Sequence, residues 1–298
     1  MSAPSLRSMT GFGRGTATRG ATRATVEVRA VNGRFAEVNV RAPRSLNPHE
    51  AEVVGRVKDA LARGNATVSV TLDRSEEAAP LAVNAAAAAA IGRALREVAE
   101  AAGLGAASVS VADVLRFQEA TAPPAADVEA QEAEAWAATS AALDEALRRL
   151  AAMRAAEGAA LGDALSAHAD DLERHTEAVE GRAPVRVEEH RQRLTERLET
   201  LLADDRLDRA RLETEIALLA DKLDVTEETV RLRSHVAQFR DALASGEPVG
   251  RRLNFIAQEM NREANTIAAK ANDPELAVHA VGMKEALEKI REQVANVV

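Results

Sequence analysis

The chain has 298 residues and a formal net charge of −9, and it contains no cysteine, no tyrosine and one tryptophan. The lack of cysteine excludes a disulfide framework and thiolate chemistry, and no apolar run reaches the length of a membrane span or a signal-peptide core. We therefore expect a cytosolic protein that does not bind a membrane, and the abundance of Ala and Leu predicts a largely helical one.

Charge is distributed unevenly along the sequence. Residues 1–70 hold 11 Lys and Arg against 5 Asp and Glu, whereas the remainder holds 27 against 42. A basic front end on an acidic body fits the electrostatic footprint of an RNA-binding protein. The alternative is that Arg simply replaces Lys in a composition rich in Ala and Arg.

Alternating apolar residues predict two strands within residues 25–42. A loop over residues 32–34, with Gly33 at a positive φ, would join them as a hairpin that pairs Val28 with Val38. A two-residue turn would instead mix the two faces of the hairpin. The predicted buried face holds Val26, Val28, Ala30, Ala36, Val38 and Val40.

The opposite face of this hairpin is polar and basic. It would present Arg29, Asn39 and Arg41, with Arg29 opposite Glu37. Such a face can hold an RNA backbone. The alternative is a solvated surface on which the Arg29–Glu37 pair contributes little.

The next elements complete a predicted α+β unit. We expect a helix over Pro48–Arg63, a strand over Ala66–Leu72, an alanine-rich helix over Ala82–Ala101 and a short helix over Val111–Phe117. Two prolines then close the region, so residues 1–120 are expected to form an N-terminal α+β RNA-binding domain.

Residues 121–205 are expected to form a long helical hairpin that protrudes as an arm. A stripe with steps of three and four carries Leu143, Leu147, Leu150, Leu161, Leu165, His168 and Leu172. Gly181 and Pro184 should end the first helix, after which a return helix carries Val187, Leu194, Leu198 and Leu201. The arm would set the geometry of an oligomer or clamp a ligand, and His168 and His175 would be structural.

A first group of chemically active side chains follows the arm. Asp224, Glu228, Arg231 and His235 are separated by four, three and four residues, so in one helix they fall within about 60° of one another. The carboxylates and the imidazole can bind a divalent cation, and Arg can stabilise the charge on a phosphate. Alternatively, His235 acts directly as a general acid or base. The bland alternative is a set of ion pairs on a buried helix.

A second group lies in the segment Gly250–Lys270. As a helix from Leu253, it would bury Leu253, Ile256, Met260, Ala264 and Ile267. The other side carries Gln258, Glu259, Arg262, Asn265 and Thr266. These amides, carboxylate, guanidinium and hydroxyl can read base edges, hold phosphate or ligate a hard cation. The alternative is a polar seam between two helices.

Seven segments resemble the YicC/YloC family of bacterial endoribonucleases, spread over nearly the whole chain. They are Ser8–Arg14, Glu27–Phe35, Arg41–Pro43, Arg63–Val70, Thr214–His235, Gly246–Lys270 and Glu288–Val297. The resemblance implies an RNA-cleaving activity, a hexameric ring and a shared C-terminal site with Glu215, Asp224, Glu228, His235, Glu259, Arg262 and Glu263. We expect Glu263 to be buried and paired with an arginine. Ala269 departs from the family, which usually has serine there.

Other common catalytic motifs are absent from the sequence. It has no GxGxxG after a strand, no GxxxxGK[ST] phosphate loop, no HExxH and no GxSxG. Without cysteine or closely spaced histidines it also has no zinc-type cluster.

These observations predict an α+β protein with a helical arm (121–205) and a C-terminal helical catalytic domain (206–298). The predicted function is cleavage of single-stranded or loosely structured RNA with Mg²⁺ or Mn²⁺. The expected catalytic residues are His235, Glu259, Arg262 and Glu263, and the expected metal ligands are Glu215, Asp224, Glu228 and Glu259. The expected RNA contacts are Arg29, Asn32, Arg34, Asn39, Arg41, Arg252, Gln258 and Asn265. Other expected partners are further copies of the chain and other RNA-turnover enzymes. The alternatives are a non-catalytic, oligomeric RNA-binding adaptor and a coiled-coil scaffold.

Overall fold

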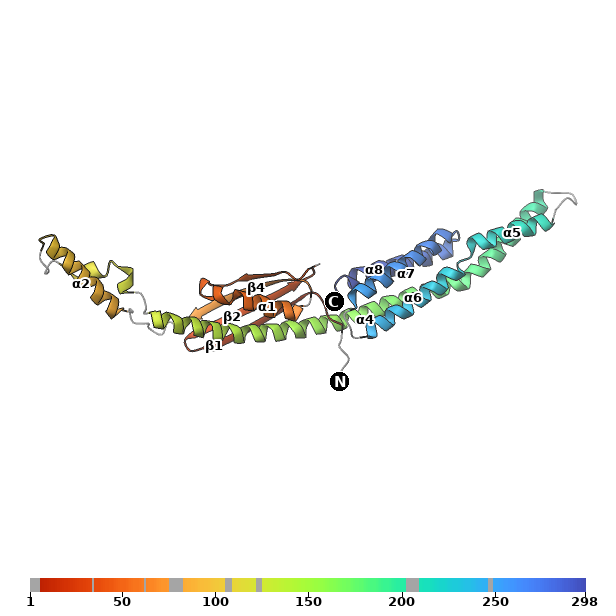
Figure 1. Ribbon diagram of the computed structural model, residues 1–298. Coiled ribbons are helices and arrows are strands. Elements are labelled where there is room, and N and C mark those ends of the chain that lie inside the picture. Colours follow the sequence, from red (N-terminus) through yellow and green to blue (C-terminus); the bar gives the residue numbers. More distant parts are fainter. Residues whose placement is uncertain are drawn as a thin grey trace. The chain divides into compact units, whose positions relative to one another are not determined.

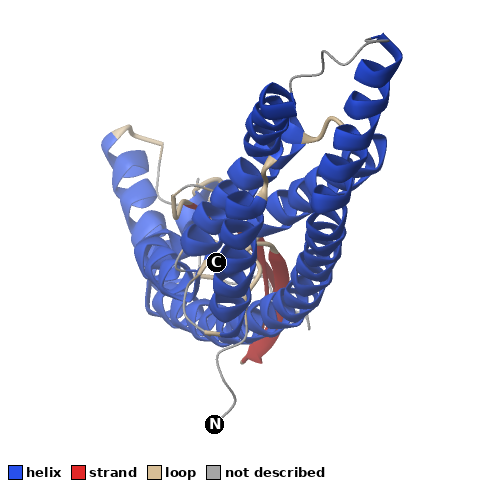
Figure 2. Cartoon of the chain, turned by 90° about the vertical axis from the view of Figure 1, so that its right-hand side faces the viewer, coloured by secondary structure: helices blue, strands red, loops and turns tan. Residues whose placement is uncertain are grey.

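A computed structural model describes residues 6–33, 35–61, 63–74, 83–104, 109–121, 125–201, 209–245 and 249–298. The chain divides into two compact units. The sheet unit holds Phe12–Ala30 and Phe35–Ala151, and the helical unit holds Met1–Gly11, Val31–Arg34 and Ala152–Val298. The predicted α+β class is confirmed, with the strands gathered in one sheet and helices making up most of the described chain (Figure 2). None of the described helices is long and apolar enough to cross a membrane.

The sheet unit is built on four strands (Figure 1). They are β1 (Gly11–Arg19), β2 (Thr22–Val31), β3 (Val38–Arg41) and β4 (Asn65–Arg74), in the spatial order β1-β2-β4-β3. A 3₁₀ helix, η1 (Arg44–His49), and helix α1 (Glu50–Leu61) connect β3 to β4. These two strands pair in parallel, with Val40 opposite Val68. The connection follows the rule that parallel neighbours need a helical crossover.

The predicted hairpin within residues 25–42 is right in its faces but wrong in its pairing. Val26, Val28 and Ala30 are buried, and Val38 and Val40 pack half-buried against the same core. However, β2 lies between β1 and β4, and β3 lies at the edge of the sheet beside β4. Alternation fixes which side of a strand is buried, but it does not choose the neighbouring strand.

The predicted Arg29–Glu37 pair is also wrong, because β2 and β3 are not neighbours in the sheet. On β2 it is Glu27 that meets a cation, the Arg14 guanidinium of β1, at 3.6 Å. Both side chains are about half exposed, so this ion pair contributes little to stability.

Strand β1 was not predicted, and its composition explains why. Its inner side carries Gly11, Gly13, Gly15 and Ala17, while Phe12, Arg14 and Thr16 point outward. The buried side therefore shows no hydrophobic periodicity. A Cβ on Gly13 would lie 2.8 Å from the Leu150 nitrogen, and one on Gly15 would lie 2.7 Å from the Ala146 nitrogen. The glycines thus let a helix backbone rest directly on the strand.

That helix is α4 (Ala125–Leu201), which contributes to both units. Within the sheet unit its apolar side joins α1 and the sheet in one core, formed by Val26, Val28, Val53, Val57, Leu61, Val68, Ala138, Ala142, Leu143, Ala146 and Leu150. Helices α2 (Ala85–Ala101) and α3 (Val111–Val114) and the 3₁₀ helix η3 (Gln118–Ala120) complete the unit. The helices predicted near these positions are confirmed.

The helical unit combines the second part of α4 with α5 (Arg209–Leu223), α6 (Thr226–Ala244), α7 (Gly250–Lys270) and α8 (Pro274–Val294). Its core includes Leu165, Leu172, Val179, Leu232, Val236, Phe239, Leu253, Met260, Ile267, Leu276, Met283 and Ile290. All five apolar residues predicted on one side of α7 are buried, so that helix and its orientation are confirmed.

Residues near the two ends of the chain also meet in the helical unit. Ser8 and Val297 form an antiparallel bridge. The Met9 nitrogen donates to the Asn296 carbonyl at 2.8 Å, and the Val298 nitrogen donates to the Arg7 carbonyl at 3.0 Å.

The predicted turn of the helical arm at Gly181 and Pro184 is wrong, because α4 continues through both residues. A proline inside a helix removes one backbone hydrogen bond and costs about 3 kcal/mol. Side chains on either side anchor this stretch. Arg182 bonds to Asp273 and Glu189, each at 2.8 Å, and Arg186 donates to the carbonyls of Lys270 (2.8 Å) and Leu223.

The antiparallel partner of this part of α4 is α6 rather than a return helix from Val187. Arg233 of α6 meets Glu180 of α4 at 2.7 Å, and Arg240 meets Glu173 at 2.8 Å. As the residue number rises along α6 it falls along α4, which shows that the two helices run in opposite directions. Leu165 and Leu172 of the predicted stripe are buried against this partner.

Asp273 links α4 to the start of α8. Its carboxylate accepts from the Glu275 and Leu276 nitrogens at 3.1 Å each and from Arg182 at 2.8 Å. The Arg182 bond is the largest of the effects that lower the pKa of Asp273 to about 2.

We expect Asp273→Ala to lower the free energy of unfolding by about 2–4 kcal/mol, because it removes both a helix cap and the partner of a mostly buried guanidinium. Asp273→Asn should lose less, since the amide oxygen can still cap α8. Since the pKa is lower in the folded protein, the stabilisation by the charge is complete above about pH 4 and disappears as pH falls toward 2. Urea unfolding of the three proteins between pH 2 and 7 measures both effects, and an Asn variant as unstable as the Ala variant would contradict the capping role.

Candidate functional site

Two predicted site residues of the helical unit, Asp224 and Glu228, meet at one end of the seam between α6 and α7. Lys270, at the end of α7, donates from Nζ to Glu228 Oε1 at 2.8 Å and to the Asp224 carbonyl at 2.6 Å. This lysine brings Asp224 and Glu228 to one place. Sequence reasoning missed its role, because the pattern of α7 marks Lys270 only as a cation in the last turn of a helix.

The spacing predicted that Asp224 and Glu228 lie in one helix, and this prediction is wrong. Helix α5 ends at Leu223 and α6 begins at Thr226, so Asp224 lies in the connection. Its Oδ1 accepts from the Thr226 hydroxyl at 2.6 Å and from the Thr226 nitrogen at 2.9 Å. These bonds, the hydroxyl bond most, lower the pKa of the Asp224 carboxyl. Asp224 is therefore an ionised carboxylate that fixes the start of α6.

His235 and Glu263 lie further along the same seam. The Lys270–Glu228 contact sets the register of two antiparallel helices joined by a short connection. His235 follows Glu228 by seven residues, about two turns of α6, and Glu263 precedes Lys270 by seven residues, about two turns of α7. Because the two helices are antiparallel, His235 and Glu263 therefore lie at the same height along the seam. His235 is half-buried and Glu263 is 4% exposed.

The burial predicted for Glu263 is confirmed, and among the described residues no arginine pairs with it. No hydrogen bond or ion pair joins the Glu263 carboxylate to any of the described residues. Its oxygens are not among the fully buried, unbonded side-chain atoms of the described residues, so the carboxylate keeps some contact with solvent.

Among the described residues, no hydrogen bond or ion pair joins the remaining predicted site residues to Asp224, Glu228 or Lys270. Glu259 and Arg262 approach to 3.7 Å on α7, and Arg231 pairs with Glu227 instead of completing the predicted stripe. Glu215 is exposed on α5, where no described side chain holds it. Gln258 and Asn265 lie on the solvent side of α7, as predicted, and Arg252 is exposed on the same helix.

The donor chemistry of the seam suits a hard cation only if solvent or substrate completes the shell. Within the described part of the chain, no three His, Asp or Glu side chains are close enough to hold a metal ion together. Mg²⁺ is commonly bound through one or two carboxylates, with water and phosphate oxygens as the other ligands. Asp224 is exposed, and Lys270 links its main-chain carbonyl to the Glu228 carboxylate.

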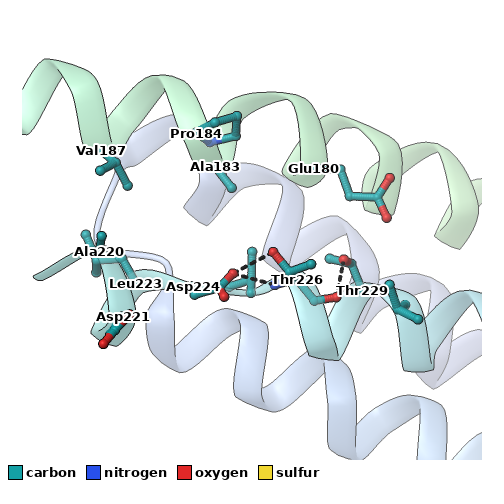
Figure 3. Close-up of a pocket in the computed structure, with 12 residues that line it drawn as sticks. Glu180, Ala183, Pro184, Val187, Ala220, Asp221, Leu223, Asp224, Thr226 and Thr229 are labelled. Atoms are coloured by element: carbon teal, nitrogen blue, oxygen red, sulfur yellow. Dashed lines mark hydrogen bonds between the residues drawn. The ribbon is translucent and has the colours of Figure 1, made fainter. Parts of the chain in front are cut away.

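A cavity of about 580 Å³ opens beside the seam, between α4 and the junction of α5 with α6 (Figure 3). Glu180, Ala183 and Val187 border it from α4, and Asp224 and Thr226 border it from the opposite side. Asp224 is thus shared by the cavity and the seam.

The sheet unit carries a separate polar surface, the outer face of its four strands. Arg29, Asn39 and Arg41 are exposed there, as predicted. Thr67 lies opposite Asn39, and Ser69 lies opposite Arg41. This face, with Arg14 of β1, offers cations and small polar groups that can contact phosphates.

Two further residues predicted to bind RNA, Asn32 and Arg34, come from the loop after β2 in the sequence. Asn32 belongs to the helical unit, where its Nδ2 donates to the Ala295 carbonyl at 2.7 Å. Arg34 lies outside the described residues.

Comparison with known proteins finds matches to one family along most of the chain. Residues 6–163 match the family region described as "Endoribonuclease YicC-like, N-terminal region", and residues 179–298 match "Endoribonuclease YicC-like, C-terminal". The chain is 33% identical over 295 residues to the probable endoribonuclease YicC of Clostridioides difficile, covering 97% of this chain and 99% of that protein. It is also 33% identical over 293 residues to the probable endoribonuclease YicC of Haemophilus influenzae, covering 98% and 99%. The chain therefore belongs to the YicC-like endoribonuclease family.

Proposed function

We propose that the protein is a divalent-cation-dependent endoribonuclease that cuts single-stranded or loosely structured RNA at the α6–α7 seam. The observation that carries the proposal is the meeting of Asp224, Glu228 and Lys270 at one end of this seam, in a chain of an endoribonuclease family. Charged groups of both signs at one place can bind a phosphodiester and the cation that neutralises it.

Asp224 and Glu228 would hold the cation, whereas Glu259 lies eleven residues, about 16 Å of helix, from Lys270 and would act elsewhere on the seam. A bound Mg²⁺ or Mn²⁺ supplies Lewis-acid polarisation of the phosphate and lowers the pKa of a coordinated water. Lys270 keeps the Glu228 carboxylate and the Asp224 main chain in fixed positions.

His235 transfers the proton in this proposal. It is half-buried on the seam, at the level of the buried Glu263 carboxylate, which would orient the imidazole. Arg262 and Arg252 are exposed on α7 and would hold the charge of the phosphate.

The proposal is tested by incubating the purified protein with end-labelled RNA in Mg²⁺, in Mn²⁺ and in EDTA. We expect internal cleavage with either metal and none in EDTA. A gel shift without cleavage would favour an RNA-binding adaptor, and neither effect would favour a scaffold. Analysis of the product ends then identifies the nucleophile, because attack by the 2′-hydroxyl cannot cut a 2′-deoxy linkage.

We also propose that the outer face of the sheet captures RNA. Replacing Arg29 and Arg41 with Ala should weaken binding of all sequences alike and reduce the slope of log affinity against log salt by roughly 0.7 for each lost phosphate contact. Arg148→Ala is the matched control, since Arg148 is exposed on α4 and pairs only locally with Glu145. Fluorescence-anisotropy titrations over a salt series measure the slope. An unchanged slope and affinity would move the RNA contacts to the polar side of α7.

Assembly into a homo-oligomer, with six copies as the family resemblance implies, is part of the same proposal. Val278 and Val281 of α8 are 68% and 56% exposed, and Phe255 of α7 is 63% exposed, so the helical unit leaves apolar side chains for a partner to cover. Light scattering at micromolar concentration should give the mass of the oligomer, and a monomer would contradict this part.

A further inference from the structure

Two histidines face each other where α4 meets α8, inside the helical unit. His175 of α4 and His279 of α8 are both half-buried, and their Nδ1 atoms lie 3.2 Å apart. The ring centroids are 5.5 Å apart and the ring planes are tilted by 55°, so the imidazoles meet through these nitrogens instead of stacking. The sequence has no closely spaced histidines, and this pair forms only because the fold joins positions 104 residues apart.

The fold holds the histidine pair in place from two sides. A Cβ on Gly282 would lie 2.3 Å from His175 Nε2, so the His175 ring rests against α8 where that helix has no side chain. The ion pair of Arg182 with Asp273 joins the same two helices. Arg182 follows His175 by seven residues on α4, and Asp273 precedes His279 by six residues at the start of α8. Both helices are therefore fixed close to the two nitrogens.

The charges around the pair favour a neutral ring. Burial is the largest of the effects that lower the pKa of His175, and the neighbouring His279 and Arg174 lower it further. The carboxylates of Asp171 and Glu285 act in the opposite direction, so negative charge also lies near this ring. A lowered pKa keeps the imidazole uncharged at neutral pH, which is the form that binds a metal ion.

We propose that His175 and His279 together bind a divalent metal ion that prefers nitrogen ligands, Zn²⁺ or Ni²⁺. Two nitrogens that bind one Zn²⁺ at about 2.0–2.1 Å and at a tetrahedral angle lie about 3.3 Å apart. The separation of 3.2 Å between the two Nδ1 atoms matches this geometry. Each ring then carries its proton on Nε2 and offers the lone pair of Nδ1. Within the described ranges no three His, Asp or Glu side chains are grouped for a metal, so water completes the shell.

This ion differs from the cation of the α6–α7 seam in its chemistry, and its binding does not depend on the proposed function. Imidazole suits Zn²⁺ and Ni²⁺, whereas Mg²⁺ and Mn²⁺ prefer oxygen ligands. With one ligand from α4 and one from α8, the ion cross-links two helices of the helical unit. Because it binds only where the folded chain brings the rings together, it stabilises the folded state.

Calorimetric titration of the full-length protein with ZnCl₂, in excess Mg²⁺ to fill sites lined by oxygen, tests the pair directly. We expect His279→Ala to weaken Zn²⁺ binding at least about tenfold, a loss that removal of even an outer-shell partner can cause. His190→Ala removes a half-buried histidine of α4 outside the pair and should bind Zn²⁺ as the wild type does. Saturating Zn²⁺ should raise the melting temperature of the wild type and of His190→Ala, but not of His279→Ala.

A second variant keeps both histidines and removes only their geometry. In Gly282→Ala the new methyl group takes the place of the His175 ring, which can swing away because it is the end of a flexible side chain, so α8 should still fold. Zn²⁺ binding should fall as in His279→Ala. Gly181→Ala is the matched control, since nothing on the described residues lies within 4 Å of its Cβ position on α4.

Melting temperatures without metal come first, and if one of the two test variants does not fold, the other decides. A wild-type protein that does not bind Zn²⁺ would overturn the proposal, because the two rings would then only share a hydrogen bond. Unchanged Zn²⁺ affinity in the folded His279→Ala or Gly282→Ala protein would also overturn it, since the ion would then bind elsewhere.

Discussion

Replacing His235 with Ala, or Glu259 with Gln, should lower the rate of RNA cleavage at least about a hundredfold, the loss typical of removing a general acid or base. Neither change should disturb the fold. His235 is half-buried on α6 and makes no hydrogen bond within the described part of the chain, and Glu259 makes only a 3.7 Å contact within its own helix. Helical circular dichroism and the melting temperature should therefore stay close to those of the wild type.

Matched controls separate the chemistry from general effects of these substitutions. His190→Ala changes the same residue type on α4, at a position outside the predicted catalytic and metal-binding set, and Glu288→Gln neutralises an exposed carboxylate on α8. Both should keep wild-type cleavage of end-labelled RNA. Full activity in the His235 and Glu259 variants, or wild-type activity in EDTA, would remove the seam from the mechanism.

Replacing Gly13 or Gly15 with Ala should destabilise the sheet unit by about 3 kcal/mol or more, an unusually large effect for a single added methyl group. The new Cβ would lie 2.8 Å from the Leu150 nitrogen or 2.7 Å from the Ala146 nitrogen, and closer still to a carbonyl oxygen of α4. These are backbone atoms of a helix, so they cannot move aside as the end of a flexible side chain can. Either strand β1 or the first part of α4 must leave its position.

Gly55→Ala is the matched control for this effect. Gly55 lies on α1 in the same unit, and nothing lies within 4 Å of the position its Cβ would take. The change should be neutral or stabilise by up to about 1 kcal/mol, because alanine favours a helix more than glycine does. Chemical denaturation measures all three variants, and a Gly15→Ala protein as stable as the wild type would show that α4 does not rest directly on β1.

The sequence predicted best those features that depend on local periodicity. The apolar side of α7 and the alternating faces of β2 and β3 follow from steps of three to four and of two residues, and these were correct. The solvent positions of Arg29, Asn39, Arg41 and Gln258 follow from the same steps.

The sequence predicted less well those features that depend on contacts between distant residues. A glycine-lined strand has no hydrophobic pattern, so β1 passed unnoticed. The proline in α4 indicated a turn, because nothing local reveals that Arg182 and Arg186 meet Asp273 and Lys270 on each side of it. The seam was predicted in part: its carboxylates were found by spacing, but Lys270 required the register of two helices.

The bridge between Ser8 and Val297 has a consequence for the order in which the chain folds during synthesis. Residues 7–9 leave the ribosome long before residues 296–298, which are their backbone partners. The sheet unit can complete its core once residue 151 has emerged, whereas the backbone groups of Arg7 and Met9 in the helical unit wait for their partners until residues 296–298 have emerged. Removing residues 296–298 would leave these backbone groups exposed to other nascent chains.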